Sequence, residues 1–166
     1  MPDAGDAADP ALGNLLIRTI VDLYHRLHQE MRDDLQGLDP QALSWTPGPD
    51  TNSVSTLVVH LLTSEAEMLR SVRGQPTRRD RSAEFAAHPS TREELLGLID
   101  AAERDLDQIG VQMTPQDLQA QRARPNKPAP QFGLFWLLRN YGHAREHLAH
   151  LQLTKQLYSL ARPDRQ

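Results

Sequence analysis

The chain of 166 residues contains no cysteine. This absence excludes a disulfide framework, a thiolate metal site and a cysteine nucleophile, so any thiol in its chemistry must arrive with a substrate. Aromatic residues make up only 5% of the sequence, whereas leucine and alanine recur throughout. That composition favours packed helices over a β-sandwich. A single domain over residues 1–166 is the simplest organisation for this length.

Two further absences restrict where the protein acts. The longest apolar run, residues 134–138, is far shorter than the roughly 18 residues of a membrane span. Residues 1–10 have neither the basic start nor the apolar core of a signal sequence, and we expect them to form a frayed tail. We therefore predict a cytoplasmic protein with no membrane partner.

The charge pattern argues against nucleic acid as a binding partner. The net charge is −4, and basic and acidic residues are interspersed along most of the chain. A nucleic-acid-binding surface needs a concentrated basic patch, which is missing. The one basic cluster, residues 78–81, is short and interrupted by an acid, and we interpret it as a solvated loop in preference to a phosphate site.

Apolar residues recur at three- and four-residue steps in four long segments, which is the spacing of amphipathic helices. In the first segment the apolar stripe runs through Leu16, Ile20, Leu23 and Leu27. We predict a first helix that ends near Gly37, a second over 54–72 capped by Asn52 or Ser53, a third from a Thr91 capping box to Gly110, and a fourth over about 132–160.

The connections between these segments are long. Residues 39–50 contain one short turn at 40–43, residues 76–89 are polar without a clean period, and proline-rich residues 114–131 cannot hold a helix. No alternating run is long enough to predict a sheet. The sequence therefore predicts an all-α fold, a four-helix bundle with long inter-helix connections.

Three histidines lie within the second and fourth predicted helices. His143 and His147 are four residues apart, so both project from one helix face, about one turn apart. His60 is embedded in an apolar stretch of the second helix. If the bundle brings these helices together, three imidazoles can bind one divalent ion and leave positions open for water or substrate.

A plainer interpretation of the histidines stays open. A pair at this spacing also occurs by chance on a solvent face, or as hydrogen-bonding residues within a bundle. We expect His25 and His28 on the first helix, and His88 in a loop, to face solvent. The interpretation of His60 is different because its neighbours are leucine and valine.

Two segments resemble a known family. The first is Trp45-Thr-Pro47-Gly-Pro-Asp-Thr-Asn52-Ser53, which leads into the helix that carries His60; the second is Tyr141-Gly-His143-Ala-Arg-Glu-His147-Leu-Ala-His150. Both are similar to motifs of the DinB-like (DinB/YfiT-like) metalloenzymes. The resemblance implies a four-helix bundle in which His60, His143 and His147 hold a divalent metal ion, with zinc, nickel and iron all suitable.

The resemblance also implies a class of chemistry. Better-understood family members are S-transferases or a thiol-dependent isomerase that use low-molecular-weight thiols, and relatives often form homodimers. His150 falls where many relatives have glutamine, so it is open whether it supports a ligand, lines a pocket or lies on the surface. Family membership predicts the site better than the reaction.

Other residues near the ligands are candidates for proton transfer or for lining a pocket. Glu65, Glu67 and Glu146 can orient a ligand or move a proton, although a charged outer helix face is an alternative for each. The candidate pocket residues are Trp45, Ser64, Asn140 and His150.

Two functional hypotheses follow. The first is a divalent-metal-dependent enzyme whose small-molecule substrate is a thiol, acting in conjugation, isomerisation or a related hydrolysis. The second is a non-catalytic metal-binding or oligomeric scaffold whose polar triad stabilises the bundle. The sequence does not choose the metal, the substrate or the proton-transfer residue.

Overall fold

The computed structural model describes residues 9–162 except 77–78, 81, 83, 85–88, 90 and 125–126. Residues 1–8 of the predicted tail lie outside the described part of the chain, and His88 does as well. Among the described helices, none has both the length and the apolar character that a membrane span needs.

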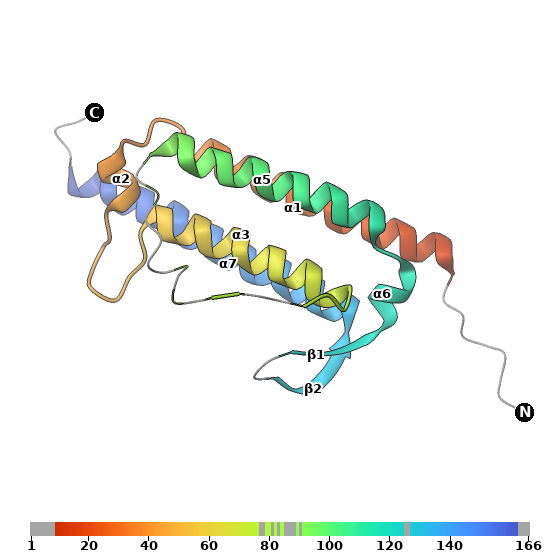
Figure 1. Ribbon diagram of the computed structural model, residues 1–166. Coiled ribbons are helices and arrows are strands. Elements are labelled where there is room, and N and C mark those ends of the chain that lie inside the picture. Colours follow the sequence, from red (N-terminus) through yellow and green to blue (C-terminus); the bar gives the residue numbers. More distant parts are fainter. Residues whose placement is uncertain are drawn as a thin grey trace, which may run out of the picture.

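Four long helices make two layers. Helices α1 (Pro10–Leu35) and α5 (Arg92–Gln112) lie side by side in one layer, and α3 (Val54–Val72) and α7 (Gly133–Ala161) form the other (Figure 1). The predicted all-α four-helix bundle is confirmed. Because α3 and α7 pack against each other along their length, residues on their facing sides are brought together.

Local signals explain where these helices begin and end. The Ser53 side chain accepts a hydrogen bond from an N–H in the first turn of α3, and Thr91 and Glu94 form the predicted capping box of α5. Gly37 and Gly74, which follow α1 and α3, have positive φ angles of 73° and 69°. Only glycine adopts this backbone conformation without strain, so both helices end where the sequence predicts.

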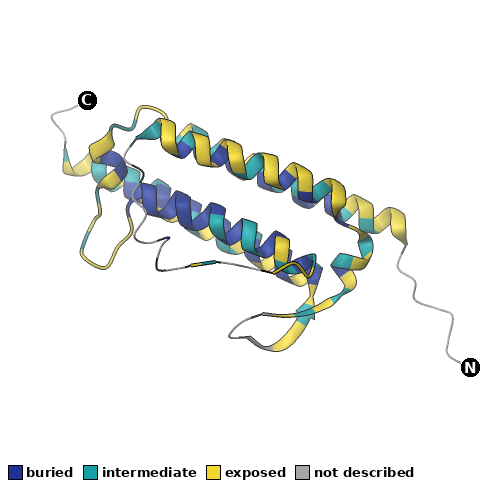
Figure 2. Ribbon diagram, in the orientation of Figure 1, coloured by how far each residue is buried: buried dark blue, intermediate teal, exposed yellow. Residues whose placement is uncertain are grey.

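The core lies between the two layers. Buried residues lie on the inner faces of the helices, and most residues of α3 are buried (Figure 2). Each fully buried leucine or isoleucine stabilises the fold by roughly 1.5–3 kcal/mol relative to an exposed one. The largest fully buried side chains are Tyr24, Leu27, Met31, Leu35, Leu43, Leu61, Leu69, Leu95, Ile99, Leu106, Leu137 and Leu148.

The connections differ in part from the prediction. The expected turn is present as helix α2 (Pro40–Ser44), but α5 does not end at Gly110 and continues to Gln112. Residues 114–131, expected to be irregular, contain the short helix α6 (Pro115–Gln119) and a hairpin of β1 (Gln121–Arg124) and β2 (Lys127–Phe132). Pro128 and Pro130 fall between the paired positions of this two-stranded ladder, where a missing N–H is tolerated.

The exposed face of α1 is also different from the prediction. Tyr24 is fully buried, whereas Leu23 is only half-buried, so the inner face of α1 is rotated relative to the expected stripe. This rotation places His28 in the core with no exposed surface, and its expected solvent-facing position is wrong. His25 is partly exposed and hydrogen-bonds Asp107 of α5.

A substitution at Gly133 tests the packing at the start of α7. A Cβ atom added there would overlap the carbonyl oxygen of Asp117 and lie 2.9 Å from the Val72 side chain. We expect Gly133→Ala to lower the free energy of unfolding by about 2 kcal/mol, because backbone cannot move aside cheaply. Urea unfolding measures this change.

The matched control is Gly97→Ala on α5, where nothing lies within 4 Å of the added atom. There the substitution removes only the flexibility of glycine, so a gain of about 0.5–1 kcal/mol is expected. Equal stability changes in the two variants would mean that the close approach at Gly133 is absent.

Candidate metal centre

The facing sides of α3 and α7 bring the three predicted ligands together. His60 of α3 and His143 and His147 of α7 each offer one nitrogen, and these three atoms all lie within 4.8 Å of one another. The predicted three-histidine cluster is therefore present. His60 is buried, and the two α7 histidines are half-exposed, so the cluster is closed on one side and accessible on the other.

The spacing of the nitrogens suits a metal ion. The Nε2 atoms of His60 and His143 are 3.4 Å apart, and the ring centroids of His143 and His147 are 4.3 Å apart. Two imidazole nitrogens that bind zinc tetrahedrally at about 2.0–2.1 Å are separated by roughly 3.3 Å. The observed separation leaves room for an ion between the rings.

The protonation of the cluster also suits a metal ion. Burial, together with the charges of His143, His60 and His150, lowers the pKa of His147 to about 4. Burial is also the largest cause of a lowered pKa at His60. These two rings are therefore neutral near pH 7, which is the state in which imidazole binds metals.

One ring nitrogen of these histidines lacks a hydrogen bond. The Nδ1 atom of His147 is buried, and within the part of the chain that the structure describes it has no hydrogen-bond partner. Leaving a buried polar atom unpaired costs about 1–3 kcal/mol. The donor set and its spacing fit a divalent cation.

The other side of His60 is held by residues that the sequence analysis did not identify. Its Nδ1 atom is 3.2 Å from a carboxylate oxygen of Glu84, which is only 5% exposed. Arg79 donates to both carboxylate oxygens of Glu84, and through a third nitrogen to Glu67 at 3.0 Å. A chain of alternating charge thus extends from the histidine cluster into the connection between α3 and α5.

This chain corrects two predictions about the connection. The interpretation of residues 78–81 as a solvated loop is wrong for Arg79, whose side chain is only 12% exposed. Ser82 and Glu84 are helical within the stretch that we expected to be a loop. Nothing in the local sequence distinguishes Arg79 or Glu84 from surface charges, because their burial depends on contacts with Glu67 and His60 of α3.

The charge state of Glu84 follows from its partners. Burial opposes its ionisation, but the hydrogen bonds and charge of Arg79 outweigh burial and lower the pKa of Glu84. Glu84 is therefore a carboxylate that accepts hydrogen bonds. Nδ1 of His60 lies 3.2 Å from this carboxylate, which can accept its N–H, and 3.1 Å from Nη2 of Arg79, which can only donate. In the tautomer that Glu84 favours, the proton is on Nδ1 and the lone pair is on Nε2.

A second polar chain lies one helical turn from the cluster. Asn140 of α7 donates to Ser64 of α3 at 3.0 Å, and its carbonyl oxygen accepts from the hydroxyl of Tyr24 of α1 at 2.8 Å. All three side chains are buried. Because Asn140 precedes His143 by one turn and Ser64 follows His60 by one turn, these bonds align α3 and α7 beside the ligands.

The remaining candidates lie in different places. His150 is exposed, with its ring centroid 5.5 Å from that of His147, and Glu146 is exposed on α7. The hydrogen bond of Glu65 goes to His28 on α1. Trp45 is half-buried and packs edge-on against Tyr158 near the end of α7.

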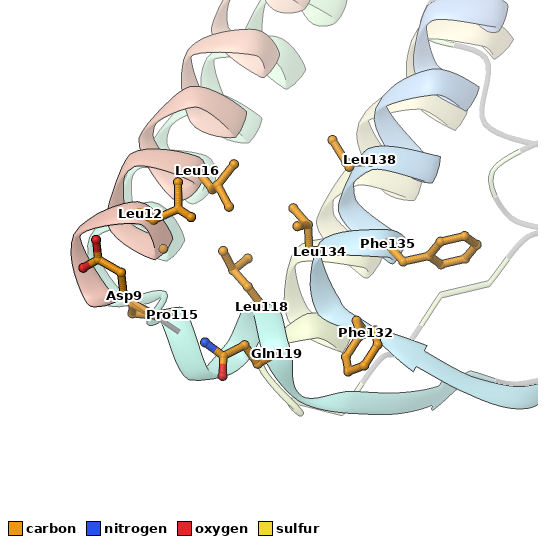
Figure 3. Close-up of a pocket in the computed structure, with 11 residues that line it drawn as sticks. Asp9, Leu12, Leu16, Pro115, Leu118, Gln119, Phe132, Leu134, Phe135 and Leu138 are labelled. Carbon is orange, nitrogen blue, oxygen red and sulfur yellow. The ribbon is translucent and has the colours of Figure 1, made fainter. Parts of the chain in front are cut away.

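An apolar cavity of about 460 Å³ lies apart from the histidines, between the first turns of α1, α6 and the start of α7 (Figure 3). None of the four candidate pocket residues lines it. Its lining is almost entirely apolar and includes Leu12, Leu16, Leu118, Leu134 and Leu138.

Comparisons with known proteins agree with this architecture. The family model described as the DinB superfamily matches residues 23–151. A DinB-like protein from Bacillus subtilis has a similar structure, with a TM-score of 0.67 and 16% identity over 85% of this chain and 92% of that one. For a DinB-like protein from Bacillus cereus, the TM-score is 0.69 and the identity is 11% over 84% and 91%. No curated protein matches the sequence.

Proposed function

The chain belongs to the DinB superfamily, and from its three-histidine cluster we propose that it is a divalent-metal-dependent enzyme that acts on a low-molecular-weight thiol. His60, His143 and His147 would hold the ion. The observation that carries the proposal is the convergence of three nitrogens, two of them on rings that are neutral near pH 7, with one side accessible.

The charge balance of the cluster supports this chemistry. A divalent ion with neutral imidazole ligands keeps its positive charge, and it can lower the pKa of a thiol or water that binds to it. Glu84 is paired with Arg79 and contacts the far nitrogen of His60, so it does not compete with a substrate anion for the ion.

The exposure of the ligands indicates the side from which a substrate would reach the cluster. His60 is enclosed by α3 and the connection after it, whereas His143 and His147 are half-exposed and His150 lies at the exposed rim. A substrate would reach the cluster from the α7 side. His150, next to His147, is the residue that we place to exchange a proton with the substrate.

Metal analysis of protein purified without an affinity tag tests the first part of the proposal. We expect one divalent ion per chain in the wild type and none in His143→Ala, which removes a central ligand. His25→Ala is the matched control, since His25 bonds to Asp107 on α5 and should leave the metal content unchanged. A wild-type protein that stays empty in excess zinc, nickel and iron would contradict metal binding.

Turnover is tested with the metal-loaded protein. We expect it to consume a cellular thiol in the presence of an electrophile or an isomerisable substrate, at a rate well above that of the free ion and of His143→Ala. Metal content with no rate above the free ion would contradict the enzyme and favour the non-catalytic metal-binding scaffold.

A further inference from the structure

The two nitrogens of His60 face different surroundings. Nε2 lies 3.4 Å from Nε2 of His143, whereas Nδ1 lies 3.2 Å from a carboxylate oxygen of Glu84 and 3.1 Å from Nη2 of Arg79. An imidazole has two neutral tautomers, and only the one with the proton on Nδ1 leaves Nε2 free to bind a metal. Glu84 can accept the Nδ1 proton, whereas Arg79 can only donate to an unprotonated Nδ1, so which of the two pairs with Nδ1 determines whether His60 is a competent ligand.

We propose that Glu84, locked by Arg79, is the positioning residue of the metal centre: it keeps the proton of His60 on Nδ1 and aims Nε2 at the ion. This inference rests on the proposed metal site. It assigns a role to residues of the connection between α3 and α5.

The geometry separates this role from that of a fourth ligand. The group of nitrogens within 4.8 Å of one another contains only His60, His143 and His147 in the part of the chain that is described. Glu84 contacts the opposite nitrogen of His60, on the side away from His143. It thus acts through His60 and not on the ion directly.

Arg79 explains why Glu84 stays in this position. It donates to both carboxylate oxygens, one of them at 2.7 Å, and this fork holds the carboxylate in one orientation. Its bond to Glu67 ties the guanidinium to α3, and its Nη2 lies closer to Glu84, at 2.7 Å, than to Nδ1 of His60, at 3.1 Å. A buried carboxylate without such a partner would carry a large desolvation cost. Arg79 therefore stabilises Glu84 as an ionised acceptor.

His147 is different in the same cluster. Its Nδ1 atom is buried without a hydrogen-bond partner among the described residues. In the described part of the chain, no side chain contacts this nitrogen in the way that Glu84 contacts Nδ1 of His60. His60 is therefore the pre-oriented ligand, and removing its support should weaken the whole site.

The first measurement is metal affinity by competition with a chelator. Loss of a residue that supports a metal-binding histidine typically costs about 10–100-fold in affinity, and we expect this range for Glu84→Ala. Glu84→Gln keeps an acceptor oxygen, so it should recover most of the affinity. The control Glu30→Gln also removes a carboxylate from an arginine pair, that of Arg145, but touches no histidine, and it should bind as the wild type does.

The second measurement needs no metal. Nitrogen-15 NMR of the metal-free protein, at a pH where His60 is neutral, reports which ring nitrogen carries the proton. We expect Nδ1–H in the wild type, in Glu84→Gln and in Glu30→Gln, and a shift toward Nε2–H in Glu84→Ala.

The outcomes distinguish this inference from the proposed function. A wild type that binds no metal contradicts the proposed function, and the NMR comparison still decides whether Glu84 sets the tautomer. An unchanged tautomer in Glu84→Ala overturns the positioning role. So does Glu84→Ala protein that binds metal as tightly as the wild type.

Discussion

Removing divalent metal with a chelator is expected to lower the melting temperature of the protein by roughly 8–16 °C. A ligand that binds only the folded state stabilises it by about 4 kcal/mol when its free concentration is 1,000 times the dissociation constant. For a domain of this size, each kcal/mol shifts the melting temperature by roughly 2–4 °C. His60 and His143 are 83 residues apart in the chain, so unfolding separates them. Calorimetry with and without metal measures the shift.

Two histidine variants make this result specific. His143→Ala should melt at the same temperature with and without metal, because the ion has lost a central ligand. His25→Ala should keep the whole shift, since His25 bonds to Asp107 outside the cluster. A wild-type melting temperature that does not respond to saturating metal would contradict the site.

The triad was predictable because its signals are local. The four-residue spacing of His143 and His147 guarantees a shared face once α7 forms. The leucines and valines around His60 place that residue on a buried part of α3. Only the pairing of α3 with α7 had to come from the fold, and in a four-helix bundle few alternatives exist.

Arg79 and Glu84 were not predictable for the opposite reason. Both lie in a polar connection without helical periodicity, where charged residues are normally solvated. Their burial results from bonds to Glu67 and His60, which lie 12 and 24 residues away from their partners. A single sequence carries no signal for contacts of this kind.

The error at His28 had a different source. Tyr24, Leu27 and Met31 form the buried stripe of α1, and His28 lies on the same face, between the positions of Leu27 and Met31. Choosing Leu23 instead of Tyr24 as the stripe residue rotated the predicted inner face away from His28. An aromatic residue with a polar tip can be buried when its hydroxyl has a partner, as Tyr24 does in Asn140.

We also expect a large effect on stability when the buried pair of His28 and Glu65 is broken. Glu65→Leu should lower the free energy of unfolding by about 3 kcal/mol, measured by urea unfolding. His28 is fully buried and its Nε2 is 2.8 Å from the Glu65 carboxylate. Its Nδ1 already lacks a hydrogen bond among the described residues, with Glu103 at 3.8 Å. Removing Glu65 therefore leaves both nitrogens of a buried imidazole without a partner.

The double variant His28→Leu/Glu65→Leu should recover most of this loss and come within about 1 kcal/mol of the wild type, because apolar groups of similar volume need no hydrogen bonds. The single variants then sum to a far larger cost than the double variant. Additive effects would show that the two side chains are not coupled. Glu65→Leu should also keep its metal content, since Glu65 bonds to His28 on the α1 side of the bundle. Loss of metal in a folded Glu65→Leu protein would instead make Glu65 part of the metal centre.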